Sequence, residues 1–368
     1  MKVFFDGGIF NQQKVGGISR LGFELIKGLE KNKDIERIFY HGFYVDHYLF
    51  KKEWFSKYYG FKRPDFLKGR IFNFLDNVGV NYFYNINADK NLIYHSLYYR
   101  VPKKPIGPIV VHCYDMIQEL FGGNAKTIQF KKKAFDVADL IISISESTKK
   151  DLCKLYSIGS ERVVVAYPGV SETFFKDRSL MVQGRKRPYM LYVGARNYKY
   201  KNFEFLLNTF ISKKYFLNFD LVIVGGEREL TLEQKSKIKN TTGNGEWLLQ
   251  EFCDDEKLAE LYLSAAVFVY PSLYEGFGIP PLEAMACGCP VVASSASSIP
   301  EVVGNGALLF NPNDPNDLAE KIEKVLHDKI LVTDLIQKGK IRAGQFTWEA
   351  MANTIYKAYV EVLKIKNT

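Results

Sequence analysis

The stretch 270-YPSLYEGFGIPPLEAMACGCPVVASSASSIPEVV-303 joins a glycine-rich turn to a proline pair and a run of small residues. The apolar run 266-AVFVYPS-272 leads into it and predicts a buried strand. The proline pair suits the first turn of a helix, and Gly288 suits the cap that ends it. The run 290-PVVAS-294 then predicts a second strand. A strand, a loop, a helix and another strand form the repeating unit of a parallel sheet.

The loop of this unit, 274-YEGFGI-279, has the features of an anion site. Glycines let backbone N–H groups approach a ligand closely, and a helix N-terminus adds partial positive charge, so the loop is a candidate phosphate cradle. Glu275 and Glu283 lie beside it, and carboxylates accept charge-assisted hydrogen bonds from sugar or ribose hydroxyls. A ligand that offers phosphate and hydroxyls together is a nucleotide sugar, which we expect to bind here.

Short apolar runs alternate with amphipathic helical patterns along the rest of the chain. This alternation predicts an α/β, doubly wound architecture with parallel sheets covered on both faces. A polar, basic break at 176-KDRSLMVQGRKRP-188 separates two such series, so we expect two Rossmann-like domains facing a cleft, residues 1–180 and 188–346, followed by terminal helices in 347–368. The predicted strands are residues 2–5, 36–43, 108–114, 140–145, 162–167, 189–194, 219–225, 266–271 and 290–294, and predicted helices include 18–31, 201–214 and 255–265.

The composition is that of a globular protein, with 47% hydrophobic and 25% charged residues. No apolar run reaches the roughly 18 residues of a membrane span, and the start, MKVFFDGGIF, predicts a first strand rather than a signal peptide. Five cysteines, with no second pair near Cys287 and Cys289, favour reduced thiols and a cytoplasmic location over disulfides or a metal site.

The net charge of +9 is unevenly placed, because residues 1–187 carry 31 basic and 19 acidic side chains. Such a basic half favours phosphorylated ligands or anionic lipid as partners. Segment 51-KKEWFSKYYGFKRPDFLKGRIFNFL-75 mixes cations with aromatic rings, so we hypothesise peripheral contact with an anionic membrane at its inner face. The alternative is a basic surface whose aromatic rings lie in the core. No nucleic-acid-binding motif is present, so nucleic acid is not an expected partner.

Several motifs together resemble the retaining glycosyltransferases of family 4, which have the GT-B fold. Seven residues separate the two glutamates within EGFGIPPLEAMACGCPVVAS, and 299-IPEVV-303 follows. The resemblance spans nearly the whole chain, looks most like bacterial surface-polysaccharide enzymes, and implies that the helices from Trp348 cross back to the first domain. Other similar segments are 14-KVGGISR-20, 109-IVVHCYDMIQELF-121, 141-IISISESTKKDL-152, 162-RVVVAYPGV-170, 192-YVGARNYKYKN-202 and 258-LAELYLSAAVFVYPS-272.

The resemblance implies roles for the central stretch. Glu283 would bind the ribose hydroxyls, and Glu275 would face the transferred sugar. The backbone at Phe277, Gly278 and Ile279 would hold the diphosphate or the sugar. Further donor contacts are expected at Gly194, Gly225 and Phe252.

A second cluster, 194-GARNYKYKN-202, follows a predicted strand and offers Arg196, Lys199 and Lys201. Cations at a strand end can neutralise a leaving diphosphate. Local sequence does not separate the two lysines, but the resemblance favours Lys201, because the family's lysine precedes an asparagine and the next helix.

The first predicted domain contributes two further groups. Gly16 and Gly17 open a helix, which suits the approach of a phosphate or sugar, although a plain strand-to-helix turn would look the same. The family often has a histidine directly before an aspartate, whereas here Tyr114 precedes Asp115 and His112 lies two residues earlier. Strand alternation places His112 and Tyr114 on one face, so either side chain is a candidate for the donor contact, with Tyr114 favoured by position. His112 is otherwise a core histidine.

The expected reaction is transfer of a hexosyl group from GDP-mannose or a UDP-hexose to a glycan or lipid-linked saccharide. The resemblance implies retention of configuration, and no carboxylate is clearly placed as a nucleophile, so we favour a front-face transfer in which the leaving diphosphate helps to accept the acceptor's proton. The chain has no Asp-x-Asp motif, so we expect no essential metal and no cofactor. The alternatives are a nucleotide-sugar epimerase of the same fold, a glycogen-type synthase and a non-catalytic protein that binds sugar nucleotides.

Overall fold

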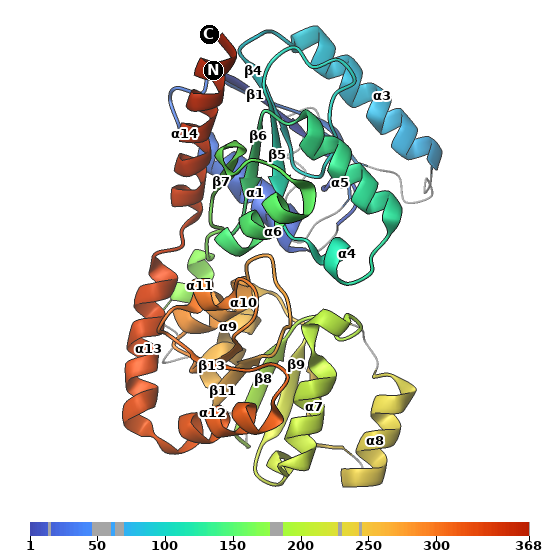
Figure 1. Ribbon diagram of the computed structural model, residues 1–368. Coiled ribbons are helices and arrows are strands. Elements are labelled where there is room, and N and C mark those ends of the chain that lie inside the picture. The colour runs from blue at the N-terminus through green and yellow to red at the C-terminus, as the bar shows by residue number, and fades with distance from the viewer. Residues whose placement is uncertain are drawn as a thin grey trace. The chain divides into compact units, whose positions relative to one another are not determined.

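The computed structural model describes residues 1–13, 16–45, 60–62, 70–176, 187–226, 230–242 and 245–367. It divides the chain into two compact units, each built on one parallel sheet (Figure 1). The N-terminal unit comprises Met1–Pro168 with Trp348–Thr368, and the C-terminal unit comprises Gly169–Thr347. The predicted α/β class with two Rossmann-like sheets is confirmed. Within the described residues, no helix is both long enough and apolar enough to span a bilayer.

The sheet of the N-terminal unit has the strand order β3-β2-β1-β4-β5-β6-β7. The order changes direction between β1 and β4, which makes this pair the topological switch point, where α/β sheets bind ligands. The strands are β1 (Lys2–Asp6), β2 (Arg37–Tyr44), β3 (Gly60–Lys62), β4 (Leu92–Ser96), β5 (Ile109–Cys113), β6 (Leu140–Ser143) and β7 (Val163–Val165), and the α-helices are α1 (Gly17–Leu29), α3 (Arg70–Asn87), α4 (Ile117–Leu120), α5 (Ala125–Val137), α6 (Glu146–Tyr156) and α14 (Trp348–Asn367).

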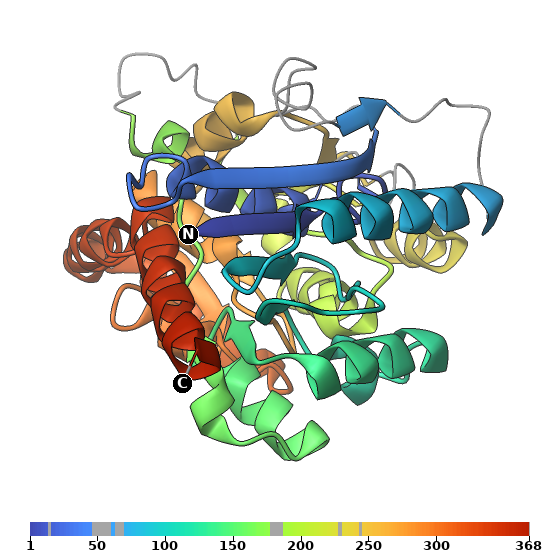
Figure 2. The ribbon, with the colours of Figure 1, turned by 90° about the horizontal axis from the view of Figure 1, so that it is seen from above.

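The last helix, α14, completes the N-terminal unit by packing against α1 (Figures 1 and 2). A Cβ atom at Gly28 would lie 2.7 Å from the Cβ of Ala352, so the two helices approach closely where α1 has no side chain. The Tyr356 hydroxyl donates to Asp34 at 2.7 Å, and Lys366 donates to Asp139 at 2.6 Å. The terminal helix is therefore held to the first unit along its length.

The sheet of the C-terminal unit has the order β10-β9-β8-β11-β12-β13, with its switch point between β8 and β11. Its strands are β8 (Tyr189–Val193), β9 (Asp220–Val224), β10 (Leu248–Glu251), β11 (Val267–Tyr270), β12 (Val291–Ser294) and β13 (Leu308–Phe310). Its α-helices are α7 (Phe203–Ser212), α8 (Leu232–Thr242), α9 (Asp255–Ser264), α10 (Ile279–Ala286), α11 (Ile299–Val303), α12 (Pro315–His327) and α13 (Lys329–Gly344).

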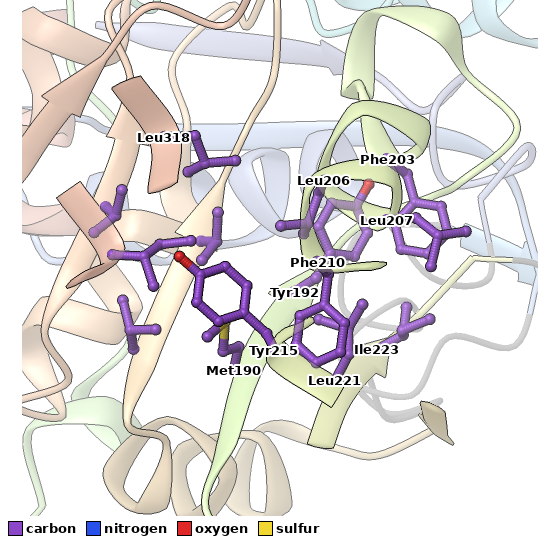
Figure 3. Packing of buried hydrophobic residues seen from close by; sticks show 14 of the residues in the cluster. Met190, Tyr192, Phe203, Leu206, Leu207, Phe210, Tyr215, Leu221, Ile223 and Leu318 are labelled. Carbon is purple, nitrogen blue, oxygen red and sulfur yellow. The ribbon is translucent and has the colours of Figure 1, made fainter. Parts of the chain in front are cut away.

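Alternate residues of the central strands point to opposite faces of this sheet. Met190 and Tyr192 of β8 join a buried cluster with Phe203 of α7 and Leu318 of α12 (Figure 3). On the other face, the Phe268 ring of β11 packs edge-on against Tyr262 of α9, with 5.3 Å between ring centroids. Helices therefore cover both faces, which explains why the strands are apolar throughout.

All nine predicted strands are present, each within two residues of its expected ends. The structure adds β3, β4, β10 and β13, which the sequence pattern did not indicate. The units divide between Pro168 and Gly169, before the predicted break at 176–188, most of which lies outside the described residues. The division falls earlier because Val170 donates to the Phe346 carbonyl at 3.0 Å and Phe174 packs against Tyr262, which ties 169–176 to the C-terminal unit.

Candidate functional site

The loop that follows β11 leads into α10 as the sequence predicts. Gly278, directly before the helix, has φ +102°, a left-handed conformation that glycine adopts without strain. No side chain caps this helix end, and prolines occupy its first turn. The N-terminus of α10 thus presents backbone N–H groups and partial positive charge, which suits an anionic ligand.

Glu275 forms an ion pair with Lys201 at the switch point of the C-terminal sheet. The Lys201 ammonium donates to the two Glu275 carboxylate oxygens at 2.8 and 3.0 Å. Both side chains are largely buried, whereas Lys199 is exposed. The geometry therefore distinguishes two lysines that the sequence left equivalent.

Two serines that the sequence analysis missed hold the Glu275 loop in place. The Ser297 hydroxyl donates to the Glu275 carbonyl at 2.7 Å and accepts from the Glu275 N–H at 3.3 Å. The Ser298 hydroxyl lies 2.9 Å from the same carbonyl and 2.8 Å from the Phe277 carbonyl. The only sequence signal was the small, polar run after β12, which does not say which backbone group each hydroxyl meets.

Glu283 is a buried carboxylate on α10. Its side chain accepts a hydrogen bond from the Tyr262 hydroxyl at 3.3 Å, and only 5% of the residue is exposed. Burial raises the pKa of Tyr262 well above its ordinary value, and the charge of Glu283 raises it further, so this phenol stays a donor. Glu283 is therefore not a solvated surface residue of the helix.

The other predicted residues of this unit follow the neighbouring strands. Gly194 and the buried Arg196 come after β8, Gly225 comes after β9, and Phe252 comes after β10 with 56% of its surface exposed. Because β10, β9, β8 and β11 are consecutive parallel neighbours, their carboxyl ends meet at one edge.

The β8 and β9 loops also touch each other closely. A Cβ at Gly226 would lie 3.1 Å from the Gly194 carbonyl oxygen and from the Ala195 Cα, so glycine permits this contact. The sequence analysis did not predict a role for Gly226. The glycine pair directly after β9 was the signal that could have indicated it.

The predicted glycines of the N-terminal unit lie at the start of α1. Gly16 precedes the helix and Gly17 is its first residue. The Ser19 N–H donates to the Gln13 side chain at 3.2 Å, and the space where a Gly17 side chain would project is open. Lys14 and Val15 of the same motif lie outside the described residues.

His112 of β5 and Tyr114, directly after the strand, lie on one face, as alternation predicted, and their rings stack with 5.1 Å between centroids. Both are buried. The Tyr114 hydroxyl donates to the Leu97 carbonyl at 2.7 Å, and the Asp115 carboxylate accepts from the Ile117 N–H at 3.0 Å. In this structure neither His112 nor Tyr114 presents its polar atoms to solvent.

His112 belongs to a chain of buried polar groups. Its Nδ1 lies 2.9 Å from Nε2 of His95, and His95 Nδ1 is hydrogen-bonded to the Tyr359 hydroxyl on α14. Burial lowers the pKa of His112 to about 3, and burial followed by the neighbouring His112 lowers the pKa of His95 well below its ordinary value. Both imidazoles are therefore neutral at pH 7.

Residues 176–342 match the family model described as "Glycosyl transferases group 1". Through this segment, the chain is similar to the group 1 glycosyltransferases. The segment contains every site residue of the C-terminal unit, from Gly194 to Glu283. The resemblance to glycosyltransferases predicted from the motifs is confirmed for this segment.

A curated relative is the O-antigen chain mannosyltransferase B of Escherichia coli, to which this chain is 31% identical over 242 residues. The alignment covers 62% of this chain and 62% of that protein, which is less than two thirds of its length.

Two solved structures share the fold. Sucrose-phosphate synthase from Thermosynechococcus elongatus has a TM-score of 0.78 at 20% identity, covering 99% of both chains. HepE from Anabaena, in complex with UDP-glucose, has a TM-score of 0.74 at 17% identity, covering 98% of this chain and 100% of that one. The fold of this chain is therefore of the GT-B class.

Proposed function

We propose that the chain is a glycosyltransferase that moves a hexosyl group from a nucleoside diphosphate sugar to a glycan or lipid-linked saccharide in surface-polysaccharide synthesis. The observation that carries the proposal is the Lys201–Glu275 ion pair at the switch point of the C-terminal sheet, within the segment that matches the group 1 family. Buried Arg196 and the N-terminus of α10 belong to the same edge and add positive charge for a diphosphate.

The proposed donor is GDP-mannose first and a UDP-hexose second. The name of the Escherichia coli relative supports mannose, and the UDP-glucose complex of HepE supports a sugar nucleotide in this fold. Glu283 would accept hydrogen bonds from the ribose hydroxyls, and Glu275 would face the sugar. Phe252 is exposed beside this edge and offers a ring face to the base.

In the proposed mechanism, Lys201 and Arg196 stabilise the diphosphate as its bond to the sugar breaks. An ammonium has three donors, so Lys201 can hold a phosphate oxygen while it remains bound to Glu275. We propose retention of configuration by a front-face transfer. Because these cations supply the countercharge, we also propose that no metal is essential, which full activity after dialysis against EDTA would support.

A non-catalytic sugar-nucleotide-binding protein is the second candidate. The observation that favours it is the burial of His112 and Tyr114, the two residues proposed to reach the donor sugar from the N-terminal unit. Such a protein would bind the donor but would neither transfer the sugar nor hydrolyse the donor slowly. We therefore propose, as part of the transferase function, donor-side roles for Tyr114, His112, Asp115, Gly16 and Gly17.

Thermal shift and calorimetry against UDP, GDP, ADP, CMP and their sugars would test the proposal. Nucleotides with one particular base should bind to the wild-type protein and raise its melting temperature. The Glu283→Ala variant should show a much smaller shift and weaker binding. The matched control is Glu320→Ala, because Glu320 is exposed on α12, where it pairs with Lys321 and Lys324. No response of wild type to any nucleotide would refute the proposal. Product analysis with the responding sugar nucleotide then separates an enzyme from a binding protein.

Acceptor binding at a membrane surface is also proposed, through the basic aromatic segment 51–75. Most of this segment lies outside the described residues. Flotation with anionic liposomes at low salt would test it, and absence of binding would exclude the contact.

A further inference from the structure

The N-terminal unit contains a pocket of about 310 Å³ that none of the proposed donor residues lines. It lies at the switch point of that unit's sheet. Gly8 and Gln12 follow β1, and the residues from Tyr98 to Val101 follow β4. Ligand pockets span roughly 300–1,000 Å³, so this one is sized for a small group rather than a whole nucleotide.

One wall of the pocket is formed by Arg100. Its Nη2 donates to Asp76 at 2.7 Å, and its Nε lies 3.8 Å from Asp6. Its Nη1 is buried and has no hydrogen-bond partner among the described residues. A buried N–H without a partner costs free energy, so the described residues leave the hydrogen-bonding capacity of the Arg100 guanidinium incompletely satisfied.

The charges around Arg100 decide what kind of ligand fits. Two carboxylates, Asp6 and Asp76, face the single guanidinium, so this wall has no surplus positive charge. Lys133 also lines the pocket but is exposed. A phosphate or carboxylate would therefore gain little here, whereas a neutral hydroxyl could accept from the guanidinium without adding charge.

The remaining lining suits a sugar ring. Asn77 and Gln12 supply amides, each of which both donates and accepts hydrogen bonds, as hydroxyl groups require. Tyr98 is half-buried and Phe130 of α5 is 46% exposed, so aromatic surface is available to a ligand. The negative face of an aromatic ring attracts the slightly positive C–H bonds of a pyranose.

The pocket adjoins the strand end that carries the predicted residues of this unit. Tyr98 follows β4, and Asp115 follows its neighbour β5. Burial raises the pKa of Tyr98, and the charge of Asp115 raises it further, so the phenol and the carboxylate interact. A ligand in the pocket would therefore lie beside the Asp115 strand end.

We propose that this pocket is the subsite that holds one neutral sugar ring of the glycosyl acceptor. The proposal rests on the proposed transferase function, because it assigns the second substrate of that reaction. It specifies an uncharged pyranose, bound by Arg100, Asn77 and Gln12 through hydroxyls and by Phe130 through its ring.

The test is saturation-transfer NMR on the full chain with methyl α-glycosides of mannose, glucose, galactose and N-acetylglucosamine. At least one glycoside should bind to wild type, and Phe130→Ala should weaken that binding about ten-fold, which corresponds to about 1.4 kcal/mol. Phe121→Ala is the matched control, because Phe121 has similar exposure (41%) but does not line the pocket, and it should bind like wild type. Gln12→Ala provides a second loss-of-binding variant.

Nucleotide-induced thermal shifts on the same samples separate the two proposals. Wild type that binds a nucleotide but no glycoside would overturn the acceptor subsite and leave the transferase proposal standing. Equal glycoside binding by wild type, Phe130→Ala and Gln12→Ala would also overturn it. Loss of glycoside binding in both pocket variants, with an unchanged nucleotide shift and melting temperature, would support it.

Discussion

Glu275 and Lys201 lie 74 positions apart in the chain, yet their side chains form one ion pair at a sheet edge. The sequence predicted that both belong to the site, but it could not show that they bind each other or that Lys199 is exposed. Which of two nearby lysines turns inward depends on the short helical turn Lys199–Lys201. The serine contacts to the Glu275 backbone were missed for a similar reason, because they join loops 22 residues apart.

Replacing Lys201 with alanine should lower kcat by about 10²–10³, since loss of one group that stabilises developing charge typically has this effect. The kcat of Lys199→Ala should stay close to that of the wild type, because the Lys199 side chain is exposed. Steady-state kinetics with the donor that passes the binding test would measure both. Equal losses in the two variants would show that Lys201 has no special role.

At the scale of elements, the pattern of apolar runs predicted nine strands and missed β3, β4, β10 and β13. β4 is fully buried, but its sequence, LIYHS, ends in a histidine and a serine. The buried histidine is tolerated because His95 bonds to both His112 and Tyr359. β10 (LLQE) is an edge strand with intermediate burial, and β13 has only three residues, so neither leaves a clear pattern.

The histidine pair that links β4 to β5 should make stability depend on pH. The folded pKa of each histidine lies below its unfolded value of about 6.5, so the unfolded state binds more protons as pH falls. Stability is therefore lost below about pH 6.5, at about 1.4 kcal/mol per pH unit for each histidine, and for His112 this continues to about pH 3.

Urea unfolding at pH 7 and pH 5 would check this, with His112→Gln as the test variant. Between the two pH values, the free energy of unfolding of the variant should fall by about 2 kcal/mol less than that of the wild type. The control His327→Gln, at an exposed position on α12, should behave like wild type. Identical pH dependence in wild type and His112→Gln would mean that His112 is not held neutral.

At the scale of the whole molecule, the two units differ in how the chain builds them. The C-terminal unit is one continuous segment, whereas the N-terminal unit needs the distant helix α14 to cover α1. Sequence periodicity predicted that a terminal helix exists. Its return to the first unit came only from the family resemblance, because a helical pattern does not name its packing partner.

A chain that stops after Thr347 should keep a folded C-terminal unit and lose a stable N-terminal unit. Removing α14 uncovers α1 around Gly28 and removes the Tyr359–His95 contact. Limited proteolysis followed by mass spectrometry should release a resistant fragment near residues 169–347, while residues 1–168 are digested. A control chain that ends at Ile365 should resist like the full chain. Equal resistance of both halves in the shortened chain would contradict the expectation.

The close approach of Gly28 to Ala352 also sets an order of events during synthesis. A ribosome makes α1 early, but its partner helix is made only after the whole C-terminal unit has been translated. The N-terminal sheet must therefore wait with α1 uncovered, although its strands are already complete, and exposed apolar surface of this kind attracts chaperones and promotes aggregation. The half of the chain that is translated first is thus the half that finishes folding last.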